Sequence, residues 1–403
     1  MLDIQFTRSQ FPALSSDWAF MDNAGGSVPC RQAIERTREH MERLPFQLGA
    51  SYGPSVEAQA AVDAGRRAAA ALLAAEVDEV VLGSSSTTLA YRLSAALSCA
   101  WQAGDEVIVT NLDHEANIGP WRKLEQMGIV IREWRVREET LTLHKADLES
   151  LLGERTRLVA FTHSSNIIGS ILDVPDLCAT IRAAGALSCV DGVAFAPHRR
   201  VDVRALGADF YFASLYKIYG PHYAMLFGRR ELLLEAQNLS HFFVPDDSLP
   251  GKFEPGGVSY EAVASLVGIT DYMQAFGAQH GLGDALDLKG CFDIIAGYEM
   301  KLLQPLLSFL EDHPKVRLLG SPIAEASTRV PTVAFTVEGR RSSEIPPLLD
   351  ERSIAIRYGH FYAYRLIHDL GLLEGDGILR TSLVHYNSEE EVSKLINALG
   401  DLL

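Results

Sequence analysis

Short apolar runs alternate with helix-like stretches between residues 60 and 230, and this alternation limits the possible folds more than any other feature. The helix-like stretches include residues 61–75 and 176–184. The runs are apolar along their whole length, as in strands that are buried on both faces. Such strands, alternating with helices, indicate a mostly parallel sheet with helices on both sides. The runs lie at residues 80–82, 106–109, 158–161, 187–190 and 210–213.

The pattern changes after residue 272. A long helical pattern over 288–312 is followed by strand-like segments at 316–319, 331–337 and 354–357, with a helix-like segment at 343–351 and a closing helix from Ser388. A chain of 403 residues is long enough for two unequal lobes. We predict an α/β fold with a large domain at 17–272, which contains the mostly parallel sheet, and a smaller α+β domain at 273–403, completed by residues 1–16.

Composition excludes several classes of partner. The net charge is −16 and no basic stripe is present, which argues against nucleic acid and against an anionic membrane surface. No segment reads as a secretory signal or approaches membrane-spanning length. The five cysteines are scattered without a C-x-x-C pair, so neither a disulfide framework nor a metal site is indicated. We expect a cytoplasmic protein without nucleic-acid, membrane or metal partners.

Polar residues follow each of the apolar runs. They are Ser84 to Thr88, Asp113 with His114, Ser164 to Asn166, Asp191, and Ser214 to Lys217. The loops after the carboxyl ends of parallel strands meet at one edge of a sheet and commonly bind a ligand there. A single ligand in contact with all five loops would explain the arrangement.

The residue types in these loops suit pyridoxal phosphate. A lysine directly after a buried strand, Lys217, is partly desolvated, which lowers the pKa of its amine and favours carbonyl chemistry. The carboxylate of Asp191 could pair with a protonated pyridine nitrogen. Hydroxyls at a helix start, in Ser84 to Thr88, suit a phosphate group, and the ring of His114 could stack on a cofactor plane.

Each of these residues also has an ordinary explanation when taken alone. A strand-end Asp often forms a turn, and Ser/Thr runs often cap helices. Rival motifs are incomplete. The Ser214-x-x-Lys217 pattern of serine acylases lacks its Ser-Asp-Asn and Lys-Thr-Gly partners, and the zinc-protease start at His114 has Ile118 where a second His is needed. A nucleophile elbow beginning at Gly83 has Thr87 in place of its second glycine.

In these residues and their order, the chain resembles the class V aminotransferase family of fold-type I enzymes, and within it the cysteine desulfurase-like branch. The resemblance extends over nearly the whole length and keeps the family's motif order. The matching segments are residues 20–26, 86–88, 113–121, 164–169 and 380–387, together with Asp191 and Lys217.

The resemblance implies pyridoxal 5'-phosphate as cofactor, with Lys217 as its Schiff-base partner and as the proton shuttle at the substrate α-carbon. It also implies a small amino-acid or sulfur-conjugate substrate and a homodimer with shared active sites. The implied cofactor-binding residues are Ser86, Thr87, Thr88, His114, Asn166, Asp191, Ser214, Tyr216, Lys217 and Gly257, the last reaching the neighbouring subunit's phosphate. The implied substrate-binding residues are Asn23, Asn166, Arg357 and Arg380.

Four positions depart from the pattern of the desulfurase branch. Tyr362 stands where these enzymes carry the sulfur-accepting cysteine, and a tyrosine cannot form a persulfide. Ala194 stands where the family usually has a polar residue, so one hydrogen bond to the cofactor's phenolic oxygen is lost. Tyr216 replaces the histidine before the lysine, and Gly257 replaces a common threonine.

The preferred interpretation is therefore a carbon–sulfur β-lyase that works by α,β-elimination without a persulfide-forming cysteine. An aminotransferase, or an epimerase similar to isopenicillin N epimerase, would use the same lysine, aspartate and arginine, so both stay open. A catalytically degenerate member that only binds the cofactor is a further alternative, against which the presence of Lys217, Asp191 and Arg380 argues.

Overall fold

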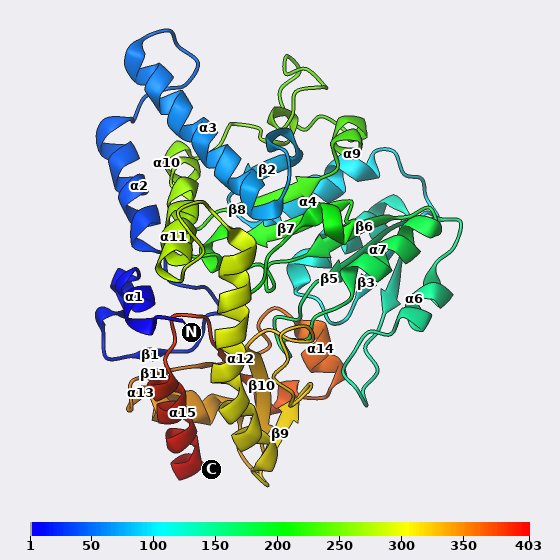
Figure 1. Cartoon of the computed structure of the whole chain (residues 1–403). Helices are drawn as coiled ribbons and strands as arrows, with labels where there is room; N and C mark the ends of the chain where they lie inside the picture. The colour runs from blue at the N-terminus through cyan, green and yellow to red at the C-terminus, as the bar shows by residue number, and fades with distance from the viewer. Residues whose placement is uncertain (1) are drawn as a thin grey trace.

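A computed structural model describes residues 2–403 and contains a seven-stranded sheet and a four-stranded sheet, with a long helix between them (Figure 1). The larger sheet has the order β2-β8-β7-β6-β5-β3-β4. All of its pairings are parallel except the two made by β8, which runs antiparallel to β2 and β7. Its strands are β2 (Val80–Gly83), β3 (Glu106–Thr110), β4 (Val130–Trp134), β5 (Thr156–Thr162), β6 (Leu187–Asp191), β7 (Phe210–Ser214) and β8 (Ala224–Gly228).

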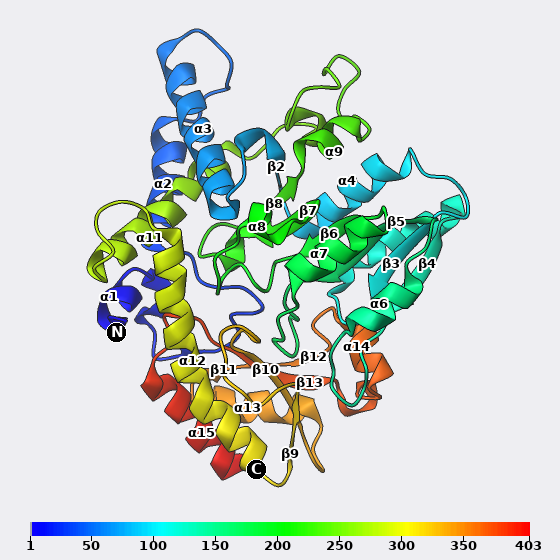
Figure 2. The same ribbon diagram turned by 45° about the vertical axis from the view of Figure 1, so that its right-hand side comes forward.

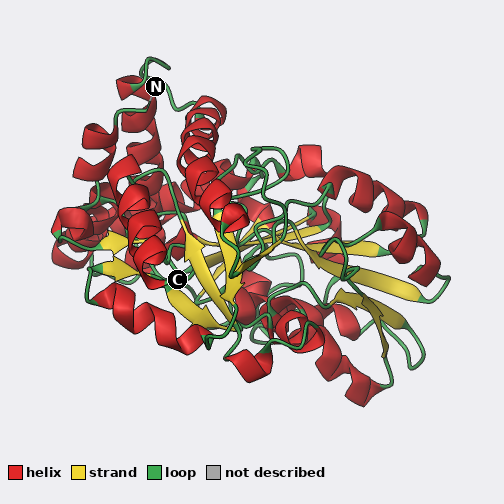
Figure 3. Cartoon of the chain, turned by 90° about the horizontal axis from the view of Figure 1, so that it is seen from below, coloured by secondary structure: helices red, strands yellow, loops and turns green. Residues whose placement is uncertain are grey.

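Successive residues of the central strands enter two different hydrophobic cores. In β5, Val159 and Phe161 pack with α3 (Gly53–Leu73) and α7 (Val174–Ala183), whereas Leu158 and Ala160 pack on the opposite face with α4 (Ser86–Ser98). This alternation explains why the strands are apolar throughout, because both faces are covered. Figure 3 shows the helices on both sides of the strands. The predicted α/β fold with a mostly parallel sheet is confirmed.

The smaller sheet is antiparallel, in the order β12-β13-β10-β9. Its strands are β9 (Val316–Leu319), β10 (Thr332–Val337), β12 (Arg357–Gly359) and β13 (Ile378–Ser382). It shares a core with α12 (Leu288–Asp312), α13 (Ile345–Asp350) and α15 (Glu389–Leu402). A parallel pair of β1 (Ala19–Phe20) and β11 (Ile354–Ala355) brings the start of the chain to the same region. The boundary predicted at 272/273 stays a prediction.

The remaining helices complete the two faces and the connections. They are α1 (Ile4–Ser9), α2 (Arg31–Arg43), α5 (Gly119–Arg122), α6 (Lys145–Leu151), α8 (Val203–Leu206), α9 (Arg230–Glu235), α10 (Tyr260–Ala264), α11 (Leu266–Gln279) and α14 (Tyr364–Asp369). Within residues 2–403, no helix combines the length and apolar character required to span a bilayer.

The segment that follows β12, including α14, contacts the loop after β3 of the large sheet. Figure 2 shows α14 below α6 and beside β12, the edge strand of the smaller sheet. The amide of Glu115, after β3, donates to the carbonyl of Tyr362 at 2.8 Å, and Asn111 donates to Asp369 at 2.9 Å. The carboxyl ends of the large sheet are therefore covered by residues that arrive late in the sequence.

Candidate active site

A cavity lies at the carboxyl ends of β2, β3, β5, β6 and β7, where the sequence predicted a ligand. Eight of the predicted cofactor-binding residues line it: Ser86, Thr87, His114, Asn166, Asp191, Ser214, Tyr216 and Lys217. Ser85, Ala116, Thr162, Ser164, Val193 and Ala194 complete the wall. The structure thus brings together side chains that come from five separate loops.

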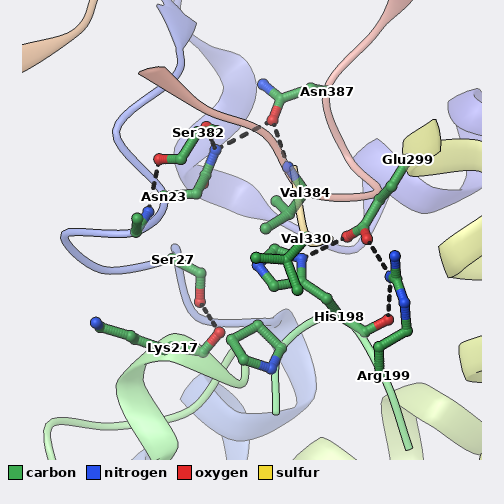
Figure 4. Close-up of polar contacts among 12 residues, drawn as sticks. Asn23, Ser27, His198, Arg199, Lys217, Glu299, Val330, Ser382, Val384 and Asn387 are labelled. Carbon is green, nitrogen blue, oxygen red and sulfur yellow. Dashed lines mark hydrogen bonds and ion pairs between the residues drawn. The ribbon is translucent and has the colours of Figure 1, made fainter. Parts of the chain in front are cut away.

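Lys217 ends the short 3₁₀ turn η5 (Leu215–Lys217) that follows β7. The hydroxyl of Ser27 donates to the carbonyls of Tyr216 and Lys217, at 3.0 and 2.9 Å, and fixes this turn. The side chain extends away from that contact, and its Nζ has no hydrogen-bond partner among residues 2–403 (Figure 4). Burial lowers the pKa of Lys217 to about 8, aided by the charge of Arg380 and opposed by Asp191 and Asp22. The site therefore holds a buried amine that loses its proton easily.

The lowered pKa of Lys217 predicts how cofactor attachment depends on pH. Only the unprotonated amine can attack an aldehyde, so the rate of attachment to cofactor-free protein should rise with pH and level off above about 8. Visible absorbance followed after mixing with pyridoxal phosphate at a series of pH values measures this rate. A midpoint near the ordinary lysine pKa of 10.5 would contradict the buried position of the amine.

Asp191 is the last residue of β6 and faces the same cavity. Its Oδ1 accepts a hydrogen bond from the amide of Val193 at 2.9 Å, which fixes the direction of the carboxylate. Burial raises the pKa of Asp191, while the amide of Val193 and the charge of Lys217 oppose that rise. The next residue, Gly192, has to be a glycine, because a Cβ atom there would lie 2.0 Å from the hydroxyl of Tyr211 and clash with it. A buried carboxylate of this kind gains from a cationic partner in the cavity.

The start of α4 provides the polar end of the cavity. The hydroxyls of Ser86 and Ser214 are hydrogen-bonded to each other at 2.8 Å, and Thr87 lies beside them in the wall. Ser85 caps the helix by accepting from the amide of Thr88 at 3.1 Å. Free amide groups and the helix dipole at such a terminus favour a phosphate group.

His114 presents a neutral ring to the cavity. Its Nδ1 accepts a hydrogen bond from the amide of Ala116 at 3.0 Å, so the proton of the neutral ring belongs on Nε2. Burial lowers the pKa of His114 to about 3, and the charges of Lys217 and Arg380 act in the same direction. Its ring also stacks on Tyr362, with centroids 5.0 Å apart. A neutral ring can pack flat against a cofactor without adding charge to the site.

Arg380 reaches the site from β13 and is almost fully buried, with 3% of its side chain exposed. Its Nη1 donates to the carbonyl of Asn166 and its Nη2 to Oδ1 of Asp22, both at 3.1 Å. Within residues 2–403, its Nε is buried without a partner. Burial lowers the pKa of Arg380 to about 10, against the effect of Asp22. An unsatisfied buried donor on a clamped guanidinium suits a substrate carboxylate.

Asp22 is a residue that the sequence analysis missed. Besides Arg380, it pairs with Arg357, whose Nη1 lies 3.3 Å from Oδ2 of Asp22 and whose side chain is 59% exposed. Asp22 and Arg380 are 358 residues apart, so local sequence gives no sign of the contact. Asp22 stands inside the segment 20–26 that carried the family resemblance, and this is the one signal that could have drawn attention to it.

Besides Arg357 and Arg380, which lie beside Asp22, three predicted site residues do not line the cavity. Asn23 donates to the carbonyl of Ser382 at 2.9 Å and to Oδ1 of Asn387 at 3.1 Å, which commits its amide to the scaffold (Figure 4). The hydroxyl of Thr88 bonds to that of Ser85 at 2.9 Å. No heavy atom beyond its chain neighbours lies within 4 Å of the Cβ position at Gly257, where φ is +82°. The roles predicted for these three residues stay predictions.

The residues of the cavity fit pyridoxal phosphate. Lys217 offers an unpartnered amine for the aldehyde, and Asp191 a buried carboxylate for the pyridine nitrogen. The start of α4 offers hydroxyls and amides for the phosphate, and His114 a ring face. When bound, this cofactor withdraws electrons from the substrate α-carbon.

Comparison with known proteins agrees with this geometry. The sequence profile of the family described as aminotransferase class V matches residues 19–395. The chain is 41% identical to the aminotransferase-like protein FGM3 of Gibberella zeae, covering 99% of this chain and 98% of that protein. It is 33% identical to the cysteine desulfurase-like protein ustD of Aspergillus flavus, covering 100% and 91%.

A solved structure is similar over the same extent. The cysteine desulfurase CsdA from Escherichia coli superposes with a TM-score of 0.83 at 26% identity, covering 100% of this chain and 98% of that chain. Family, relatives and fold all agree with an enzyme that uses pyridoxal phosphate. The chain belongs to the class V aminotransferase family of pyridoxal-phosphate-dependent enzymes.

Proposed function

We propose that this enzyme is a carbon–sulfur β-lyase acting on a small amino acid or its sulfur conjugate. Lys217 removes the proton from the substrate α-carbon, and the bond between the β-carbon and sulfur then breaks. The sulfur leaves as a thiol or sulfide, and the remaining carbon skeleton reacts with water to give pyruvate and ammonia. The cavity residues hold the cofactor, and Arg380, which contacts Asn166 of the cavity wall, holds the substrate carboxylate.

The observation that carries this proposal is the absence of a sulfur-accepting thiol beside an otherwise complete site. The segment from Arg357 to Ala363 covers the cavity edge and contains no cysteine. Four of the five cysteines are buried, and the exposed one, Cys99, lies at the far end of α4 from the cavity. Burial raises the pKa of Cys189, the cysteine nearest Asp191 in sequence, well above its ordinary value. Elimination needs no such thiol, whereas persulfide transfer does.

The chain's own groups can perform the proton transfer. The Lys217 pKa of about 8 lies near neutral pH, where a group both accepts and returns a proton effectively. The clamped guanidinium of Arg380 can hold the substrate carboxylate and so fix the α-carbon beside that amine. Two relatives, cysteine desulfurases by name, support the choice of sulfur chemistry, since they are 30% and 33% identical over nearly the whole chain.

Transamination is the second candidate, because the 41% identical relative FGM3 is named aminotransferase-like. It requires the same lysine and arginine and differs in where the proton returns. Epimerisation differs only in the face to which the proton returns. The three reactions therefore share this site and separate only by their products.

A product assay with cysteine, cystine and S-alkyl cysteines tests the proposal. We expect sulfide from cysteine, a thiol from S-alkyl cysteines and a persulfide from cystine, each with pyruvate and ammonia in equal amounts and with no requirement for an added keto acid. Amino-group transfer to a keto acid without release of sulfur would replace the proposal with transamination. Exchange of the α-hydrogen for deuterium with loss of chirality alone would replace it with epimerisation.

Substitution of Arg380 by lysine should weaken substrate binding. Lysine keeps the charge but cannot present a planar pair of donors to a carboxylate. We expect KM to rise roughly 10- to 100-fold, with a smaller change in kcat. Steady-state kinetics on the cofactor-loaded variant measure both. An unchanged KM would mean that the substrate carboxylate binds elsewhere.

We further propose that two copies of the chain share their active sites. An apolar groove runs along α2 beside the turn after Lys217 and is lined by Ala33, Ile34, Met41, Pro221 and His222. Met41 and Ile34 of this groove are 63% and 42% exposed in the single chain, and adjoining exposed apolar side chains favour a protein contact. Such a contact would also bring Gly257 of one copy close to the cofactor phosphate of the other copy. Light scattering on the purified protein should give twice the mass of the chain, and a monomer at micromolar concentration would contradict the proposal.

A further inference from the structure

Two consecutive aromatic residues, Phe361 and Tyr362, have left-handed backbone conformations beside the active site. Their φ angles are +48° and +60°. Non-glycine residues rarely adopt this conformation, and bulky ones do so mainly where surrounding contacts hold them. Backbone strain of this kind is concentrated at functional sites, so the contacts that hold the pair and the contacts that it makes are both informative.

Residues of the large sheet's loops hold the pair in place. The side-chain amide of Asn166 donates to the carbonyl of Phe361 at 3.0 Å, and the amide of Glu115 donates to the carbonyl of Tyr362 at 2.8 Å. Arg365, three residues further on, forms two hydrogen bonds of 3.2 Å to the carboxylate of Glu115. The carbonyl groups of both left-handed residues therefore accept hydrogen bonds from loops that form the cofactor cavity.

The ring of Phe361 lies against the arginine that we assign to the substrate carboxylate. The guanidinium carbon of Arg380 is 3.8 Å from the ring centroid, and that of Arg357 is 5.8 Å away. The Nη groups of Arg380 are bonded to Asn166 and Asp22. Phe361 thus covers one face of the Arg380 guanidinium, whose Nη groups are held by hydrogen bonds. Contact between a cation and an aromatic face favours the charged form of the arginine.

The ring of Tyr362 lies against the histidine that we assign to the cofactor ring. The two rings are 29° apart in orientation, with centroids separated by 5.0 Å. His114 lines the cavity and Tyr362 does not, so Tyr362 reaches the cavity through its contact with His114.

Packing alone does not explain an aromatic residue at position 362. Tyr362 is 66% exposed, so its ring gains little from burial. A glycine would suit the left-handed backbone better. The contacts that a tyrosine provides there and a glycine does not are the stack on His114 and an edge-on contact with His360, with ring centroids 6.3 Å apart. Of these two histidines, His114 lines the cavity.

We propose that Phe361 and Tyr362 are positioning residues: Phe361 orients and shields Arg380 for the substrate carboxylate, and Tyr362 holds the His114 ring against the cofactor. The proposal rests on the proposed function for the roles of Arg380 and His114, and it extends that function to a residue at the position where related desulfurases carry a cysteine. The two residues act on different partners, so their substitutions have separable effects.

The test compares variants of the cofactor-loaded enzyme by visible absorbance, cofactor dissociation constant and steady-state kinetics. Tyr362→Ala should shift the cofactor's visible band and lower kcat roughly 3- to 10-fold, whereas Tyr362→Phe, which keeps the ring, should match the parent enzyme. Phe361→Ala should raise KM roughly 3- to 30-fold and leave the band in place. Tyr364→Ala is the matched control, because Tyr364 is an exposed tyrosine of the same region that stacks on His368.

A further variant, Tyr362→Gly, separates positioning from folding. Glycine relieves the left-handed backbone, so this variant should melt at or above the parent temperature and still show the shifted band. A parent-like band and kcat in both Tyr362→Gly and Tyr362→Ala would overturn the role of Tyr362, as would failure of Tyr362→Phe to restore the band. An unchanged KM in Phe361→Ala would overturn the role of Phe361.

Failure of the proposed function gives a different result. If the parent enzyme releases no sulfur product, the lyase assignment falls. The band shift of the Tyr362 variants still decides the role of Tyr362, because the band does not depend on turnover.

Discussion

Lys217→Ala should reduce turnover by at least roughly 10³-fold, the scale expected when an acid–base group that acts at the reacting carbon is removed. The amine is buried and unpartnered, and it lies in the cavity with Asp191. No other lysine lines that cavity, within residues 2–403, so none can replace it. The variant should still bind the cofactor through the start of α4, but without a covalent link.

Steady-state kinetics and cofactor content measured on the same preparation test this prediction. Lys252→Ala is a suitable control, because Lys252 is also buried but donates to the carbonyls of Leu234 and Asp246 away from the cavity. The control should lose stability and keep its covalent cofactor. Turnover within tenfold of the parent in Lys217→Ala would show that another group moves the proton.

Asp191→Asn should lower kcat by roughly 10²- to 10³-fold, equivalent to about 3–4 kcal/mol of transition-state stabilisation. The substitution keeps the shape of the side chain and removes the charge that would keep the pyridine nitrogen protonated. The loss should fall mainly on kcat, because the substrate carboxylate contacts Arg380 and not Asp191. Cofactor affinity should also fall, since a charge-assisted hydrogen bond is replaced by a neutral one.

Asp209→Asn is the matched control for this substitution. Asp209 is also buried but lies just before β7, at the amino-terminal ends of the strands, where it contacts Ser188 and Arg229. Its loss should lower the melting temperature and leave kcat per folded molecule unchanged. Similar kinetic losses in both variants would mean that Asp191 acts only through stability.

Five of the seven strands of the large sheet could be predicted because their sequence signal is local. The apolar run at 210–213 corresponds to β7 (Phe210–Ser214), and the run at 158–161 lies inside β5 (Thr156–Thr162). Polar residues directly after such strands share one edge of the sheet, and for that reason Asp191 and Lys217 could be placed together before any coordinates. The strands β4 and β8 were not among the predicted runs. The antiparallel direction of β8 has no sequence signal, because an apolar strand has the same pattern whichever way it runs.

The parts of the site that depend on distant contacts could not be predicted from spacing. Asp22 meets Arg380 across 358 residues, and Asn166 meets Phe361 across 195. Asn23 is one residue from Asp22 in sequence, yet its side chain is held by Ser382 and Asn387 instead of lining the cavity. Neighbouring side chains in an irregular segment point in different directions, and only the packed structure decides which one faces the ligand.

The most direct test of the account is to locate the cofactor's covalent link. The purified protein is loaded with pyridoxal phosphate, reduced with borohydride, digested and analysed by peptide mass spectrometry. The account predicts a single pyridoxyl-modified residue, Lys217, with no modification in Lys217→Ala. Modification of a different lysine, or none despite a visible cofactor band in the parent protein, would contradict the assignment of this cavity as the active site.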